Sequence, residues 1–109
     1  MRFNKMAKTY NKLVRDRIPE IIEATGGKCN VKILSDEEYI KMVDAKLDEE
    51  LAEYHADQNI EELADLLELV YAATLARGHT LEELEHVRAE KAKKRGAFKG
   101  KIFLVEVKE

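Results

Sequence analysis

The sequence predicts a mainly α-helical protein: four helices and a small two-stranded β element in one domain, residues 1–109. The chain of 109 residues has the length of a single domain and contains no repeat, low-complexity tract or linker-like segment. It has 45% apolar and 38% charged residues with one proline, a composition that favours helices over strands and turns. Apolar residues also recur at intervals of three and four, which is the period of a helix.

The N-terminal part is expected to contain a helix and then a strand. The helix should run from Tyr10 to about Ala24 and stop at a glycine pair. Pro19 lies inside this span and should kink the helix or begin a new turn. Residues 29–34 (CNVKIL) are flanked by turn residues and read as a short strand. Their expected partner is residues 101–107 (KIFLVEV), near the other end of the chain.

The middle of the chain should form a hairpin of two helices. Ser35 is followed three residues later by a glutamate, which is the capping-box pattern, and an amphipathic helix should continue to about Ala56. Asn59 can cap the next helix, which should end at Gly78. The apolar stripes expected to face each other are Ile40, Val43, Leu47, Leu51 and Tyr54 on the first helix and Leu63, Leu66, Leu67, Val70 and Ala73 on the second.

A second capping box predicts the fourth helix. Thr80 is followed by Glu83, and the helix should extend from Leu81 to Arg95, closed by Gly96.

Charge is divided unevenly along the chain. Residues 1–30 hold seven Lys/Arg against three Asp/Glu, residues 31–87 hold four against sixteen, and residues 88–109 hold eight against three. The net charges are therefore +4, −12 and +5. An acidic middle between basic ends suits a protein whose carboxylates hold cations while its ends meet an anion.

Several classes of protein are disfavoured by the sequence. The single cysteine, Cys29, cannot form an internal disulfide, so nothing requires an oxidising compartment. No apolar run approaches a membrane span or a signal peptide, and we expect a cytoplasmic protein without a membrane partner. The −12 middle opposes nucleic-acid binding, and no nucleic-acid motif accompanies the basic ends.

Two pairs of carboxylates flank the turn of the predicted hairpin. Glu50 and Glu53 lie three residues apart on one helix, and Glu62 and Asp65 on the next. Side chains at this spacing share one helix face, and both pairs border the apolar stripes. Such a spacing is also common on a solvated helix face. From the residues alone, a metal site and a solvated face are about equally supported. Oxygen ligands without a His or Cys cluster favour Mg²⁺, with Mn²⁺ as the alternative.

These residues carry a resemblance to a known family. KLDEELAE (46–53) followed by EELAD (61–65) resembles the EExxE…ExxD signature of the MazG-like nucleoside triphosphate pyrophosphohydrolases. That family belongs to the all-α superfamily that includes phosphoribosyl-ATP pyrophosphohydrolase. YNKLVRDRIPEII (10–22) and EKAKKRGAFKGKIFL (90–104) are similar to segments of a small-protein branch. Eight residues separate Glu53 from Glu62, fewer than expected between these motifs, which implies a tight hairpin.

The resemblance implies a reaction, a cofactor and an assembly. A nucleoside triphosphate would be hydrolysed to the monophosphate and pyrophosphate, with water attacking the α-phosphorus and Mg²⁺ holding the triphosphate. The implied metal ligands are Glu50, Glu53, Glu62 and Asp65. Glu49 would assist or orient the water, so that the catalytic carboxylates are Glu49, Glu50 and Glu53. The family typically forms dimers or tetramers with sites near the subunit interfaces, so a homodimer or tetramer is expected.

Basic side chains near both ends are candidates for binding the substrate phosphates, because cations neutralise the charge of such groups. The candidates are Lys12, Arg15, Arg17, Lys91, Lys94 and Arg95. Lys91, Lys94 and Arg95 have an ordinary alternative role, since cations stabilise a helix C-terminus. The sequence does not identify the nucleobase of the substrate. Candidates for stacking on the nucleobase are Tyr10, Tyr39, Tyr54, Phe98 and Phe103.

Two other functions remain open from the residues. Phosphoribosyl-ATP pyrophosphohydrolase activity would use the same carboxylates on a different substrate. A non-catalytic helical interaction module would bind a partner through its apolar seam and use the carboxylates only for solvation.

Overall fold

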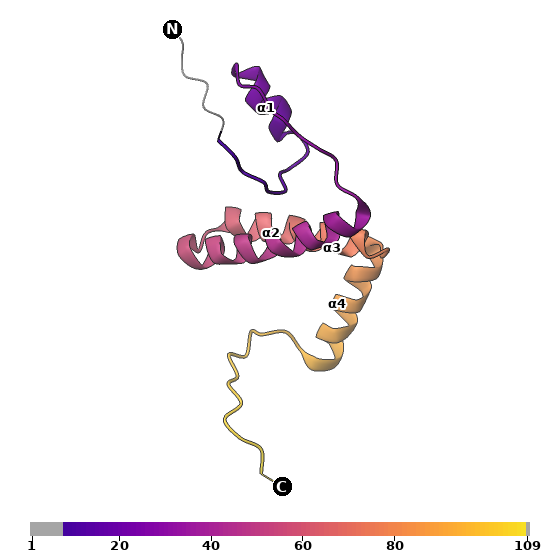
Figure 1. The fold of residues 1–109 in the computed structure, drawn as a ribbon. Coiled ribbons are helices and arrows are strands. Elements are labelled where there is room, and N and C mark those ends of the chain that lie inside the picture. Colours follow the sequence, from indigo (N-terminus) through magenta and orange to yellow (C-terminus); the bar gives the residue numbers. More distant parts are fainter. Residues whose placement is uncertain (1–7, 109) are drawn as a thin grey trace.

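The computed structural model describes residues 8–108, and this part of the chain contains four helices (Figure 1). They are α1 (Ile18–Ala24), α2 (Asp36–Asp57), α3 (Ile60–Ala76) and α4 (Leu81–Arg95). The predicted mainly α-helical class with four helices is therefore confirmed. None of these helices has the length and apolar character needed to cross a bilayer.

The first helix is shorter than the sequence prediction. It begins at Ile18 rather than Tyr10, and residues 10–17 have no helical structure. Pro19 explains the difference, because it lies in the first turn, where its missing N–H costs nothing. A helix continuing upstream would place the ring against the carbonyl of Arg15. That carbonyl instead accepts a hydrogen bond from the Ile18 amide at 3.1 Å.

The predicted two-stranded element is not seen, and this prediction is wrong for the single chain. Residues 29–34 and 101–107, which we call the extended segments, have no strand assignment. Figure 1 shows why they do not pair: the first connects α1 to α2, whereas the second lies in the C-terminal tail, on the other side of the α2–α3 hairpin. Strand-like composition was present in both segments, but the chain does not bring them together.

Helices α2 and α3 form the antiparallel hairpin that the sequence predicted. The Ser35 hydroxyl oxygen accepts a hydrogen bond from the Glu38 amide at 3.2 Å, and the Ser35 amide donates one to Oε1 of Glu38, so the capping box is complete. Only Gln58 and Asn59 separate the helices. Gln58 adopts the left-handed conformation with φ 54°, and Asn59 caps α3 through the Glu62 amide. This short turn forces the ends of α2 and α3 to lie side by side.

Helix α4 follows the predicted boundaries and departs from the hairpin. Thr80 and Glu83 form its capping box, and Gly96 closes it. The helix contacts the end of α3 and then runs away from the α2–α3 pair (Figure 1). Helix α1 packs on none of the other three helices in the described part of the chain.

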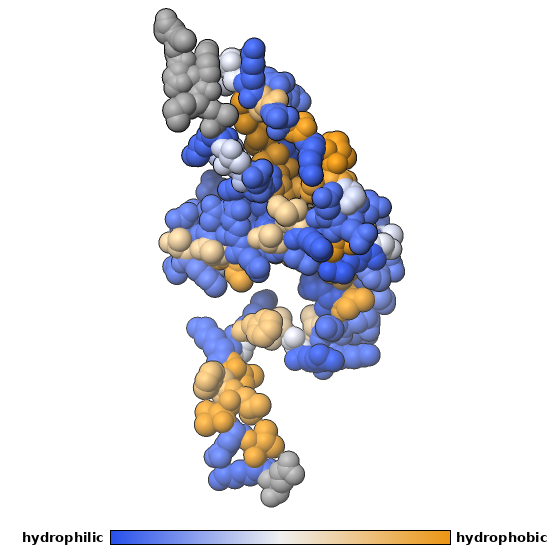
Figure 2. All heavy atoms as spheres, in the orientation of Figure 1, coloured by the Kyte–Doolittle hydropathy of each residue, from blue (hydrophilic) through white to orange (hydrophobic). Residues whose placement is uncertain are grey.

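The single chain has very little core. Among residues 8–108, Val43 is the only buried hydrophobic side chain, with 1% of its surface exposed. Leu51, Leu63 and Leu67 were predicted to line the helix seam, but each remains more than 40% exposed. The reason is geometric, because α2 and α3 share one seam and, among the helices of residues 8–108, only α4 contacts this pair, at the end of α3. Figure 2 shows apolar side chains gathered around α1 and along the C-terminal tail.

Candidate metal centre

Five carboxylates from α2 and α3 gather beside the hairpin turn, and we call them the carboxylate cluster. They form two overlapping groups, Glu49 with Glu50 and Glu53, and Glu50 with Glu62 and Asp65. Within each group, one oxygen from every residue lies within 4.8 Å of the others. All four predicted metal ligands and Glu49 therefore lie in one region, and Glu50 belongs to both groups.

Glu50 is the central member of this cluster. It is buried, with 7% of its surface exposed, and its Oε2 atom has no hydrogen-bond partner among the described residues. Burial raises the pKa of the Glu50 carboxyl, and a hydrogen bond and repulsion from Glu53 raise it further. A buried carboxylate oxygen without a partner is costly. A proton or a cation at this atom would therefore remove an unfavourable contribution to stability.

Glu62 is the second strongly perturbed carboxyl. A hydrogen bond shared with Asp57 raises the pKa of Glu62 to about 7, with further contributions from burial and from the charge on Glu53. Asp57 is not among the residues that the sequence predicted for the site. The sequence feature that could have indicated Asp57 is the two-residue turn, which places the last residue of α2 next to the first turn of α3.

The N-terminal segment supplies two cations to the cluster. Arg15 donates a hydrogen bond to Oδ1 of Asp65 at 2.6 Å, and Lys12 Nζ lies 3.3 Å from Oε2 of Glu49. These contacts span 50 and 37 residues of sequence, so they fix residues 12–15 over the hairpin. Two of the six predicted phosphate-binding residues are thereby brought to the carboxylates.

Lys46 is a member of the site that sequence reasoning missed. Its Nζ lies 3.2 Å from Glu49 Oε2 and 3.9 Å from Glu50 Oε1, and its side chain is only 19% exposed. Partial burial of Glu49 raises its pKa, but hydrogen bonds from Lys46 and Lys12 outweigh this effect and lower it. The spacing of three and four residues from Lys46 to the two glutamates was the available signal.

The charges in this region do not balance. With Asp57, the cluster amounts to six carboxyl groups, and Lys12, Arg15 and Lys46 supply three positive charges against them. Three carboxyl groups are therefore in excess of the positive charges, and their mutual repulsion would be relieved by protons, by a cation or by solvent screening.

The other predicted phosphate-binding residues lie elsewhere in the single chain. Arg17 forms an ion pair with Glu20 at 2.8 Å. Lys91, Lys94 and Arg95 lie on α4, and none of the ion pairs found within residues 8–108 joins them to the carboxylate cluster.

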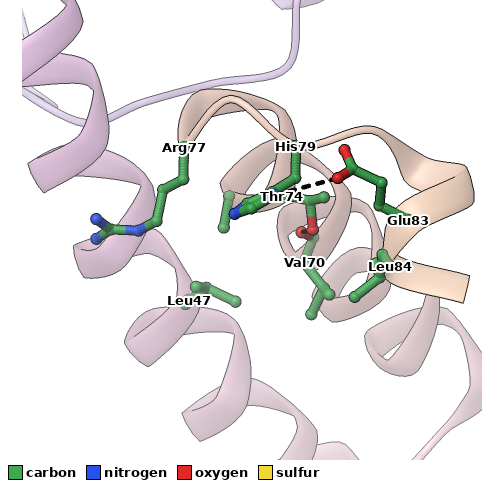
Figure 3. Close-up of a pocket in the computed structure, with 8 residues that line it drawn as sticks. Leu47, Val70, Thr74, Arg77, His79, Glu83 and Leu84 are labelled. Carbon is green, nitrogen blue, oxygen red and sulfur yellow. Dashed lines mark hydrogen bonds and ion pairs between the residues drawn. The ribbon is translucent and has the colours of Figure 1, made fainter. Parts of the chain in front are cut away.

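A separate pocket of about 390 Å³ lies where α2, α3 and the start of α4 meet (Figure 3). Its walls include Leu47, Val70 and Leu84, and His79 Nδ1 lies 3.7 Å from Glu83 Oε2 at its edge. None of the five clustered carboxylates lines this pocket. It is an apolar hollow between helices, separate from the candidate metal centre.

Comparisons with known proteins place the chain in no characterised group. An uncharacterized protein of Mycolicibacterium smegmatis is 59% identical over 44 residues. The match covers 40% of this chain and 45% of that protein, so the chain spans less than half the length of this relative. No protein-family model matches the chain, and no solved structure matches it.

Proposed function

We propose that the protein is a Mg²⁺-dependent nucleoside triphosphate pyrophosphohydrolase, acting on a canonical or modified nucleotide. The reaction consumes one water and yields a nucleoside monophosphate and pyrophosphate. Two lines support the proposal: the sequence resemblance to MazG-like enzymes and the arrangement of the carboxylate cluster. The proposal includes a cytoplasmic location and a homo-oligomer, as the resemblance implies.

One observation carries the metal assignment. Glu50 Oε2 is buried and has no hydrogen-bond partner in the described chain, while oxygens of Glu62 and Asp65 lie within 4.8 Å of a Glu50 oxygen. Solvated acidic residues point into water and do not need such an arrangement. An all-oxygen donor set that retains unneutralised charge fits a hard divalent cation, which is Mg²⁺ or Mn²⁺.

The four predicted ligands Glu50, Glu53, Glu62 and Asp65 would hold this cation. When bound, the metal neutralises phosphate charge and lowers the pKa of a coordinated water. Glu49 is held by Lys46 and Lys12 and keeps a depressed pKa. It is therefore ionised at neutral pH and can accept a hydrogen bond from an attacking water, which orients the water.

The basic residues have a second role in this proposal. Arg15 and Lys12 neutralise Asp65 and Glu49 in the chain without ligands. Cation binding to the carboxylates would release part of this attraction, and the freed guanidinium and ammonium groups could bind the triphosphate. Lys91, Lys94 and Arg95 would reach a phosphate only from a neighbouring copy or after a movement of α4, and Arg17 would need to leave Glu20.

Pyrophosphate release is the test of the proposed function. Wild-type protein is incubated with a panel of canonical and modified nucleoside triphosphates and with phosphoribosyl-ATP, with and without Mg²⁺. We expect Mg²⁺-dependent pyrophosphate release that falls at least about 100-fold in Glu50→Gln, because a buried charged ligand is lost. Glu61→Gln is the matched control, since Glu61 is an exposed glutamate one residue before Glu62.

Two outcomes would redirect the proposal. Cleavage confined to phosphoribosyl-ATP would assign the alternative substrate to the same carboxylates. Absence of pyrophosphate release, together with calorimetry that shows no Mg²⁺ binding, would favour the helical interaction module.

A further inference from the structure

The single chain exposes far more surface than a folded protein of its mass. Its accessible surface is 10016 Å², whereas a compact 12.5 kDa protein exposes about 6,200 Å². The Cα radius of gyration is 19.5 Å, compared with about 13 Å for a compact chain of this length. The surplus of about 3,800 Å² is several times the roughly 800 Å² that each partner buries in a standard interface. The chain therefore exposes enough surface for one or more large interfaces with other chains.

Much of the exposed apolar surface lies on the two extended segments. Ile33 is 94% exposed in the first segment and Phe103 is 86% exposed in the second. Their exposed apolar neighbours are Val31, Ile102, Leu104, Val105 and Val107. Four consecutive large apolar residues in a tail, 102–105, would be a strong aggregation risk if they stayed in water.

The backbone of these segments is also unpaired. Within the described chain, no backbone hydrogen bond involves residues 29–34 or 102–107. Extended backbone with free N–H and C=O groups that carries exposed apolar side chains is a template for strand pairing. The first segment lies between α1 and the hairpin and the second lies beyond the hairpin in the C-terminal tail, so the pairing does not occur within this chain conformation (Figure 1).

We propose that residues 30–34 of one copy pair with residues 104–108 of a second copy as antiparallel strands, and that the second copy reciprocates. In the register that we assign, Ile33 lies opposite Val105 and Val31 opposite Val107. Leu34 then lies opposite Leu104. These pairs match apolar side chains across the strands, which is the main source of stability in a sheet.

Charge supports the same register. Lys32 lies opposite Glu106, the one acidic residue within the second segment. In the single chain, Lys32 has only an exposed contact with Glu38 at 3.8 Å, which is readily exchanged. A shift by one residue would move every side chain of one strand to the other face and separate this ion pair. Antiparallel pairing of residues 30–34 with themselves about a two-fold axis would place Lys32 against Lys32.

Reciprocal exchange also closes the assembly. Each copy gives one C-terminal segment and receives one, so a two-fold dimer leaves no copy with an unfilled site. This inference does not depend on the proposed catalytic function, because strand pairing can be measured in a protein without activity.

Cysteine cross-linking between distinguishable copies tests the pairing. Ile33→Cys and Val105→Cys are introduced into separate chains that carry Cys29→Ser and different affinity tags, and the two chains are co-expressed. After mild oxidation, we expect a disulfide-linked dimer that carries both tags. The matched control replaces Val105→Cys by Leu104→Cys, which lies on the other face of the strand and should give at least tenfold less cross-linked dimer.

Other results would overturn the proposal. A cross-linked monomer from the double variant Ile33→Cys/Val105→Cys, without mixed dimers, would show pairing within one chain. Cross-linking of Ile33→Cys to itself would show self-pairing. Wild-type protein is measured in parallel, so that a folding defect of the variants cannot conceal the answer. We expect a dimer by light scattering and slow hydrogen exchange at the amides of residues 104–108; a monomer, or fast exchange at these amides, would exclude the pairing.

Discussion

The turn of the α2–α3 hairpin and the extended segments differ in how their structure is determined. The hairpin is built from local signals, namely the caps Ser35 and Asn59 at the starts of its helices and the left-handed Gln58 in its turn, and the turn holds charged groups in defined contacts. The extended segments have strand-like sequences, yet they lack a partner and expose their apolar side chains. The difference teaches that a single chain of this protein specifies its charged site more completely than its hydrophobic core.

The test with the largest expected effect introduces charges into the second extended segment. Phe103→Asp combined with Val105→Asp places two charges where we expect an apolar interface. The dimer dissociation constant should rise at least about 100-fold, since burying an unpaired charge costs several kcal/mol. Sedimentation equilibrium measures this change, with Lys99→Asp as a control in the exposed chain before the segment. An unchanged dissociation constant would mean that the dimer, if present, forms elsewhere.

A second test separates two roles of one residue in the site. Arg15→Ala removes the cation on Asp65, so Mg²⁺ binding by calorimetry should tighten several-fold. The same change should lower kcat/KM for the nucleotide by roughly 10- to 100-fold, because a charged hydrogen bond to phosphate contributes about 1.5–3 kcal/mol. Arg88→Ala removes the comparable exposed pair with Glu85 and should alter neither quantity. If both quantities fell together, Arg15 would be organising the site as a whole.

A third test compares packing at the hairpin with packing outside it. Val43→Ala should lower the free energy of unfolding by about 2 kcal/mol, because it removes two buried methyl groups and leaves a cavity. Val87→Ala, at a residue that is 52% exposed on α4, should change it by about 0.5 kcal/mol or less. Denaturant titration measures both variants. Equal losses would show that α4 is covered in the assembled protein.

The smallest expected effect is the pH dependence of the metal-free protein. The folded state raises the pKa of Glu62 from 4.5 to about 7, so it binds more protons than the unfolded state between these values. Stability should therefore fall as pH rises from about 4.5 to 7. The pKa of Glu49 is lowered in the folded state, so its contribution to stability is lost only as the pH falls below the usual pKa of a glutamate. That change lies outside this window. Thermal unfolding from pH 5 to 8 measures the slope.

Two additions to this measurement check its cause. Mg²⁺ should raise the melting temperature more at pH 8 than at pH 5, because the cation replaces the proton on the carboxylates. Glu62→Gln should reduce the slope, leaving the part due to Glu50. A melting temperature that does not vary with pH in either protein would contradict the assigned shift.

The sequence was sufficient for those features that depend on neighbouring residues. Capping boxes at Ser35 and Thr80 located two helix starts, and the short connection predicted the hairpin that assembles the carboxylates. The structure also brings Arg15 and Lys12, two of the predicted phosphate-binding residues, into contact with carboxylates of the cluster. The phosphate-binding role itself stays a prediction.

Features that depend on distant or external partners were not predictable. The contact of Arg15 with Asp65 spans 50 residues, and no local pattern indicates it. The periodicity of Leu51, Leu63 and Leu67 predicted burial, but a helical stripe does not reveal which element covers it. The strand prediction was wrong within one chain for a related reason, since composition shows that a segment can pair and does not identify its partner.

The unpaired state of the extended segments has a consequence for the order of folding events. Hairpin formation depends on contacts within one chain, so its rate is independent of concentration. Strand exchange needs an encounter between two chains, and under the proposed arrangement the last folding step is second order. Tenfold dilution would slow that step tenfold, and during this interval residues 101–107 would be accessible to proteases and to non-specific association. The cellular abundance of the protein would therefore set how quickly newly made chains are protected.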